Sequence, residues 1–148
     1  MVIPLWFMIV FIVFAWFFGS GGQVLAVFSQ RLHQKVGLTE ARAFEPEFKW
    51  YKTDEYAMAC ADILHFITGF LFILFYFLGN QHLAIKFGCF TFAIYIYTIP
   101  LCMFRIHFLS KNNLYPTRDK KETRKMLLIV MIFGLYSIFG TWYLWRLL

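Results

Sequence analysis

The hydrophobic positions of this chain fall into four long blocks separated by polar segments. The blocks cover residues 2–28, 56–78, 83–108 and 126–148. Each block has the roughly 20 residues that a helix needs to cross a hydrocarbon core of about 30 Å. Strands of a membrane barrel would be about ten residues long and would alternate polar and apolar side chains, which these blocks do not. The pattern therefore predicts four transmembrane helices.

The composition points to the same class of protein. Of the 148 residues, 61% are hydrophobic and 15% are charged, whereas a soluble domain is about a quarter charged. The first block follows no Lys or Arg and is longer than the apolar core of a signal peptide, so we interpret it as a structural helix that begins near Pro4. We expect one transmembrane domain over residues 1–148, an all-α integral membrane protein folded as a four-transmembrane-helix bundle.

The distribution of Lys and Arg predicts the orientation. The segments 29–55 and 109–125 hold five and six of these residues, and the opposite side holds two, Lys86 and Arg146. The positive-inside bias therefore places both long loops in the cytoplasm and both termini on the non-cytoplasmic side of a membrane. The net charge of +6 arises mostly from the Lys and Arg residues of these two loops. A nucleic-acid-binding protein would need a basic face on a soluble module, and the sequence predicts none. We therefore expect membrane lipids, and no nucleic acid, as partners.

The polar segments carry their own local signals. Thr39 is a candidate N-cap for a short helix in the first loop, which Pro46 would end. Aromatic residues follow it at the level expected for lipid headgroups. This loop suits either a solvated interfacial segment or a lid over a site that faces the cytoplasm. Gly79 and Asn80 predict a tight turn that joins the second and third helices as a hairpin.

Two ionisable residues stand inside the second block. Asp62 and His65 are three positions apart, so they share one face of a helix, roughly two turns in from the cytoplasmic side. Arg105 lies near the cytoplasmic end of the third block, and we expect it to pair with Asp62. A charged side chain in hydrocarbon costs a few kcal/mol even on lenient insertion scales, so such residues usually pair, line a cavity or do chemistry.

Further polar and small residues fall at a similar depth. From them we predict a pocket that opens to the cytoplasmic half of the bilayer, with Asp62, His65 and Arg105 as candidate catalytic residues. The candidate ligand-binding residues are Gly21, Gly22, Gln23, Tyr97 and Ser137. The glycines, and the stripe of small residues that contains Ser137, equally suit close helix packing.

The sequence gives no sign of a metal or haem site. Cys60, Cys89 and Cys102 all lie in the apolar blocks and form no C-x-x-C or Cys/His pattern. Axial haem ligands must meet one iron at a single depth, whereas His65 is deep and His107 is near the membrane edge. We therefore expect neither group as a cofactor.

The chain resembles the MAPEG superfamily, the membrane-associated proteins in eicosanoid and glutathione metabolism. The resemblance lies in the size, the four blocks and the segment Q-K-V-G-L-T-E-A-R-A-F that begins at Gln34. The family's R-x-x-x-N-x-x-E motif falls on Met58, Asp62 and His65, so all three motif residues differ. The resemblance implies a homotrimer that binds glutathione between subunits, with Tyr and Arg side chains of the third helix at the ligand. In this chain they would be Tyr95, Tyr97 and Arg105.

Three functional hypotheses follow. The first is a divergent MAPEG-like multi-pass membrane protein that binds or transforms a lipophilic small molecule in a cytoplasm-facing pocket. The second is a non-enzymatic polytopic protein, such as a toxin-immunity protein or an accessory subunit of a membrane complex. The third is a proton- or ion-handling element built on Asp62, His65 and Arg105. The sequence does not decide whether the protein is an enzyme.

Overall fold

A computed structural model describes residues 4–17, 21–29, 32, 46–112 and 120–148. The regular structure in these residues is helical, which confirms the all-α class for this part of the chain. The elements are α1 (Leu5–Ala15), α2 (Gly21–Phe28), the 3₁₀ helix η3 (Pro46–Phe48), α4 (Lys49–Phe77), α5 (Gln81–Lys111) and α6 (Lys120–Trp145).

Three of these helices contain segments long and apolar enough to cross a membrane. The segments are Tyr56–Phe77, Gln81–Lys111 and Thr123–Trp145. They coincide with the second, third and fourth hydrophobic blocks, and they indicate a membrane-embedded protein.

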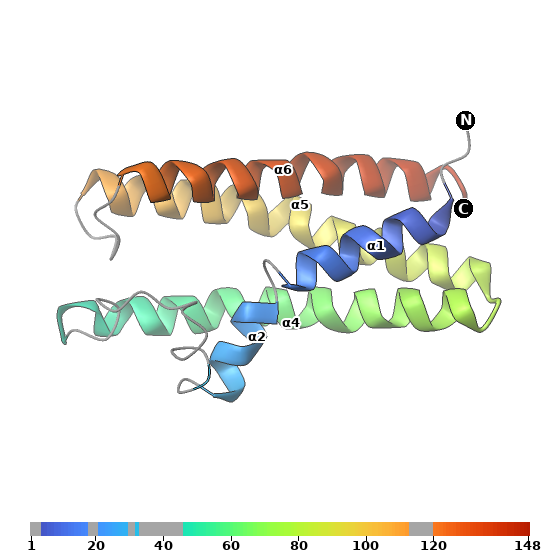
Figure 1. The fold of residues 1–148 in the computed structure, drawn as a ribbon, viewed down its shortest axis with the longest axis horizontal. Helices are drawn as coiled ribbons and strands as arrows, with labels where there is room; N and C mark the ends of the chain where they lie inside the picture. Colours follow the sequence, from blue (N-terminus) through green and yellow to red (C-terminus); the bar gives the residue numbers. More distant parts are fainter. Residues whose placement is uncertain (1–3, 18–20, 30–31, 33–45, 113–119) are drawn as a thin grey trace.

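The hairpin predicted for the second and third blocks is confirmed. Gly79 adopts a φ of 74°, in the left-handed region that a residue with no Cβ adopts at low cost. Asn80 caps α5, since its side chain accepts a hydrogen bond from the Leu83 amide at 3.2 Å. α6 then packs against α5. The beginning of α1, the end of α6 and this turn lie at one end of the molecule, and α4 and α6 begin at the other end (Figure 1).

The long helices extend beyond their hydrophobic blocks. α4 begins at Lys49 rather than at 56, α5 ends at Lys111 rather than at 108, and α6 begins at Lys120 rather than at 126. Hydropathy marks the part of a helix that suits hydrocarbon, whereas a helix continues until a residue such as Pro46 interrupts it. Trp50 therefore lies in α4 rather than in a loop. The short helix predicted from Thr39 falls outside the described residues.

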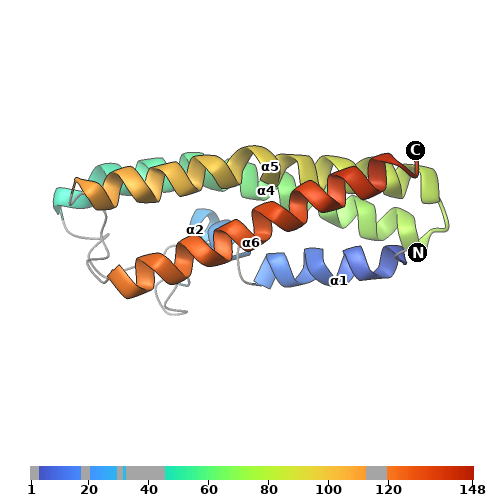
Figure 2. The ribbon, with the colours of Figure 1, turned by 90° about the horizontal axis from the view of Figure 1, so that it is seen from above.

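A continuous helix over the first block is the prediction that was wrong. The block forms two helices, and α1 has 11 residues, about 16 Å and too short to cross a bilayer core. α1 lies along α4 and α6, whereas α2 runs across α4 (Figures 1 and 2). A Cβ built on Gly21 would overlap the carbonyl oxygen of Trp16. The start of α2 therefore approaches the end of α1 at a distance that only glycine allows.

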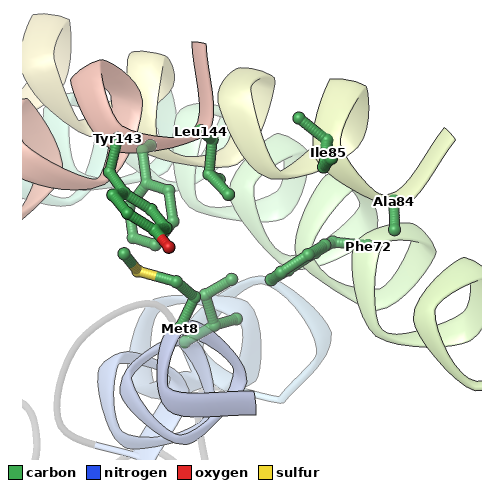
Figure 3. Close-up of a cluster of buried hydrophobic side chains, with 8 residues drawn as sticks. Met8, Phe72, Ala84, Ile85, Tyr143 and Leu144 are labelled. Carbon is green, nitrogen blue, oxygen red and sulfur yellow. The ribbon is translucent and has the colours of Figure 1, made fainter. Parts of the chain in front are cut away.

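The core gathers buried side chains from α1, α4, α5 and α6 (Figure 3). Its buried members are Met8, Ile12, Phe72, Ala84, Ile85, Phe92, Tyr143 and Leu144. α1 is held against α6 by Tyr136, whose ring stacks on Phe11 with centroids 3.3 Å apart and whose hydroxyl donates to the Met8 sulfur at 3.2 Å.

Glycines on the facing sides of α5 and α6 allow these helices to approach closely. A Cβ on Gly140 would lie 2.8 Å from the Phe92 ring, and one on Gly134 would lie 2.9 Å from Ile99. The small residues of α6 therefore serve helix packing, as small residues commonly do in bilayers.

Candidate functional site

The two ionisable residues of α4 lie on the side of this helix that meets α5. Asp62 is half-buried, and His65 is 1% exposed. Within the apolar segment Tyr56–Phe77 the sequence contains no other Asp, Glu, Lys, Arg or His. The three-residue spacing brings both side chains to one face, as predicted.

Tyr95 of α5 contacts both residues. Its hydroxyl donates a long hydrogen bond of 3.5 Å to Oδ1 of Asp62. Its ring stacks on the imidazole of His65, with centroids 3.8 Å apart and planes inclined by 2°. The phenol therefore joins the two α4 side chains into one polar cluster, which we call the Asp62–His65–Tyr95 cluster.

Apolar and aromatic side chains surround this cluster. Tyr95 packs with Ala15, Ile99 and Phe133, which come from α1, α5 and α6. One residue beyond His65, the ring of Phe66 lies 4.5 Å from that of Trp16. Four helices or their ends thus meet around a carboxylate, a phenol and an imidazole. In such low-polarity surroundings electrostatic interactions are stronger than in water.

Arg105 does not join the cluster. It lies ten residues beyond Tyr95 on α5, about 15 Å along the helix axis. α4 and α5 are antiparallel, with Gly88 beside Phe72 and Tyr95 beside Asp62, so moving from Tyr95 to Arg105 leads away from Asp62 toward the start of α4. Among the described residues, the hydrogen bond of Asp62 comes from Tyr95. The predicted Asp62–Arg105 pair is therefore not formed.

The candidate ligand-binding residues are dispersed. Gly21, Gly22 and Gln23 form the first turn of α2, and the Trp16 carbonyl fills the space beside Gly21. Ser137 is fully buried, and its hydroxyl donates to the Phe133 carbonyl of its own helix at 2.8 Å.

Tyr97 points away from the cluster. Its side chain is 71% exposed, because two positions along a helix correspond to a rotation of about 200° from Tyr95. In the single chain, therefore, neither Tyr97 nor Ser137 adds a polar group to the Asp62–His65–Tyr95 cluster.

Tyr95 is among the third-helix side chains that the family resemblance implies, but the predicted pocket included Tyr97 and not Tyr95. The signal that identifies it is a buried stripe on α5 formed by Thr91, Tyr95 and Thr98, spaced four and three residues apart. The two threonine hydroxyls donate to carbonyls of their own helix, those of Phe87 and Ile94. Tyr95 is the member of this stripe whose polar group reaches the facing helix.

Comparisons of the chain with protein-family models, with curated proteins and with solved structures find no match.

Proposed function

We propose that this chain is a multi-pass membrane protein that binds or transforms a lipophilic small molecule beside the Asp62–His65–Tyr95 cluster. The observation that carries the proposal is a half-buried carboxylate in contact with a phenol inside segments that suit hydrocarbon. Polar groups at such depth are costly and commonly mark functional sites. A few convergent polar groups within an apolar lining are also the usual form of a small-molecule site.

The proposal includes the MAPEG-like assembly that the sequence resemblance implies, a homotrimer. The single chain is compatible with such an assembly, because α5 and α6 expose large apolar side chains that a second copy of the chain can cover. They include Tyr97, Phe104, Leu135 and Trp142.

The proposed binding is tested with a long-chain fatty alcohol that carries a photoactivatable diazirine and an alkyne tag. In lipid nanodiscs, we expect saturable labelling of peptides from α4 and α5 around Asp62, which an excess of the untagged alcohol abolishes. His65→Phe should remove most of this saturable labelling while the protein still inserts, because phenylalanine keeps the ring stacked on Tyr95 but lacks the polar nitrogens.

His107→Phe is the matched control, because His107 is an exposed histidine near the far end of α5. It should label like the unmodified protein. Equal labelling of the His65→Phe protein and the unmodified protein would show that His65 serves packing alone. Labelling that never saturates would overturn the proposed function.

We also propose that the chain crosses the membrane four times, with both termini outside. The beginning of α1 and the end of α6 lie at the end of the molecule opposite the beginning of α4 (Figure 1). This arrangement supports an even number of crossings, although the first crossing is not one straight helix. Cysteines placed at Glu45 and Tyr115 should react with an impermeant maleimide only after the cells are opened. A cysteine at Asn80, in the α4–α5 turn, should react in intact cells. The reverse pattern would invert the proposed orientation.

A further inference from the structure

We propose that the lipophilic ligand carries a cationic headgroup, an alkylammonium that binds at Asp62. This inference rests on the proposed function and narrows it to one charge class. It follows from three features of the site: the carboxyl group of Asp62, which has no cationic partner among the described residues, its position at the edge of the cluster, and the aromatic rings nearby.

The carboxylate of Asp62 has no cationic partner among the described residues. Its hydrogen bond comes from the neutral phenol of Tyr95, at 3.5 Å. Across the apolar segment of α4 the sequence provides no Lys or Arg, and Arg105 lies about three turns from Tyr95 along α5. A carboxylate withdrawn from water is costly unless an opposite charge compensates it. A ligand ammonium supplies that charge.

The exposure of the cluster residues places Asp62 on the accessible side. Asp62 is half-buried whereas His65 is fully covered. Phe66 and Phe70 follow Asp62 at four-residue intervals along α4, and they are 36% and 53% exposed. This row lies on one side of the helix. An alkyl chain can therefore lie along the two phenylalanines while its headgroup reaches the carboxylate.

The aromatic rings favour a cation over other headgroups. The Trp16–Phe66 pair lies one helical turn from Asp62, and the Phe66 side chain is 36% exposed. The ring of Tyr95 is buried, and one of its faces is covered by His65. Ring faces attract alkylammonium groups, more strongly where water is excluded. An anionic headgroup would meet the like charge of Asp62. The inference therefore predicts a ligand unlike glutathione at this position.

The test compares dodecyltrimethylammonium with its neutral isostere 2,2-dimethyltetradecane, by equilibrium dialysis of radiolabelled compounds against the full chain in dodecyl maltoside. The protein should prefer the cation. Asp62→Asn should weaken cation binding about tenfold to a hundredfold, because it removes the negative charge that faces the quaternary ammonium. Binding of the neutral isostere should not change. Glu47→Gln, which removes an equal charge from an exposed residue of η3 outside the apolar segments, should leave both affinities unchanged.

The outcomes separate this inference from the proposed function. If the cation and the isostere bind equally and Asp62→Asn alters neither, the ligand is not recognised by charge, while saturable photolabelling at α4 would still support a lipophilic site. Loss of saturable photolabelling would overturn both. If Asp62→Asn does not fold, Asp62→Glu keeps the charge and should retain a measurable preference for the cation. Loss of that preference in a folded Asp62→Glu protein would contradict the inference.

Discussion

Replacing Phe72 with alanine is expected to lower the free energy of unfolding by about 3 kcal/mol, near the lower end of the range for buried Phe→Ala changes. Phe72 is fully buried and points from α4 into the cluster shared by α1, α5 and α6 (Figure 3). Its removal leaves a cavity between four helices. The loss stays at the lower end because lipid tails are as apolar as the core, so little transfer free energy is lost with the ring.

The measurement is reversible unfolding in mixed micelles by titration with sodium dodecyl sulfate, followed by circular dichroism. Phe77→Ala provides the matched control, because Phe77 lies on the same helix and is 76% exposed. It should change the free energy of unfolding by less than about 0.5 kcal/mol, as surface substitutions generally do. Equal losses for the two variants would mean that Phe72 is not part of a packed core.

Replacing Gly21 with alanine should be comparably destabilising, by about 3 kcal/mol, at the upper end of the range for overpacking. The added methyl group would overlap the Trp16 carbonyl oxygen. This oxygen belongs to the backbone, so it cannot turn aside as a flexible side chain would. The end of α1 and the start of α2 must separate, and the contact between Trp16 and Phe66 should loosen with them.

Gly79→Ala gives the comparison, because this glycine is required for a different reason. No atom lies within 4 Å of a Cβ built there, but φ is +74°. Alanine should therefore cost about 1 kcal/mol, the penalty of the left-handed conformation alone. The same unfolding titration measures the free energy of unfolding of both variants. Trp16 fluorescence, with the other tryptophans replaced by phenylalanine, reports the local environment where the end of α1 meets the start of α2. A Gly21→Ala protein that unfolds like Gly79→Ala would contradict the close approach of α1 and α2.

Much of the fold follows from the hydrophobic pattern, because the pattern records which parts of the chain suit hydrocarbon. The apolar core of α4 and the turn at Gly79–Asn80 were predicted closely. The break in the first block was not, since hydropathy does not register a change of helix direction. Gly21 and Gly22 were identified from the sequence, but glycine is compatible with tight packing as well as with a break, and the contact of Gly21 with Trp16 depends on tertiary structure.

The candidate site was predicted in part. Asp62 and His65 were identified as one face of a helix, which depends on local spacing alone. Their partner depends on the register between α4 and α5, which the sequence does not specify. The prediction chose Arg105 for its charge, whereas the register brings Tyr95 to Asp62. The sequence signal that distinguishes Tyr95 from Tyr97 is its spacing from Thr91 and Thr98, which places these three residues on one face of a helix.

Because α1 is short, the lipids of the two leaflets of a bilayer contact different helices of this protein. In a core about 30 Å thick, lipids of the leaflet near the termini meet α1, which ends beside Phe66 through Trp16. Asp62 lies one helical turn beyond that point, toward the opposite leaflet. Beyond the end of α1, α4 is in contact with α2 instead. For the proposed lipophilic ligand, the two leaflets would then offer different routes to Asp62, and its distribution between them would govern its supply.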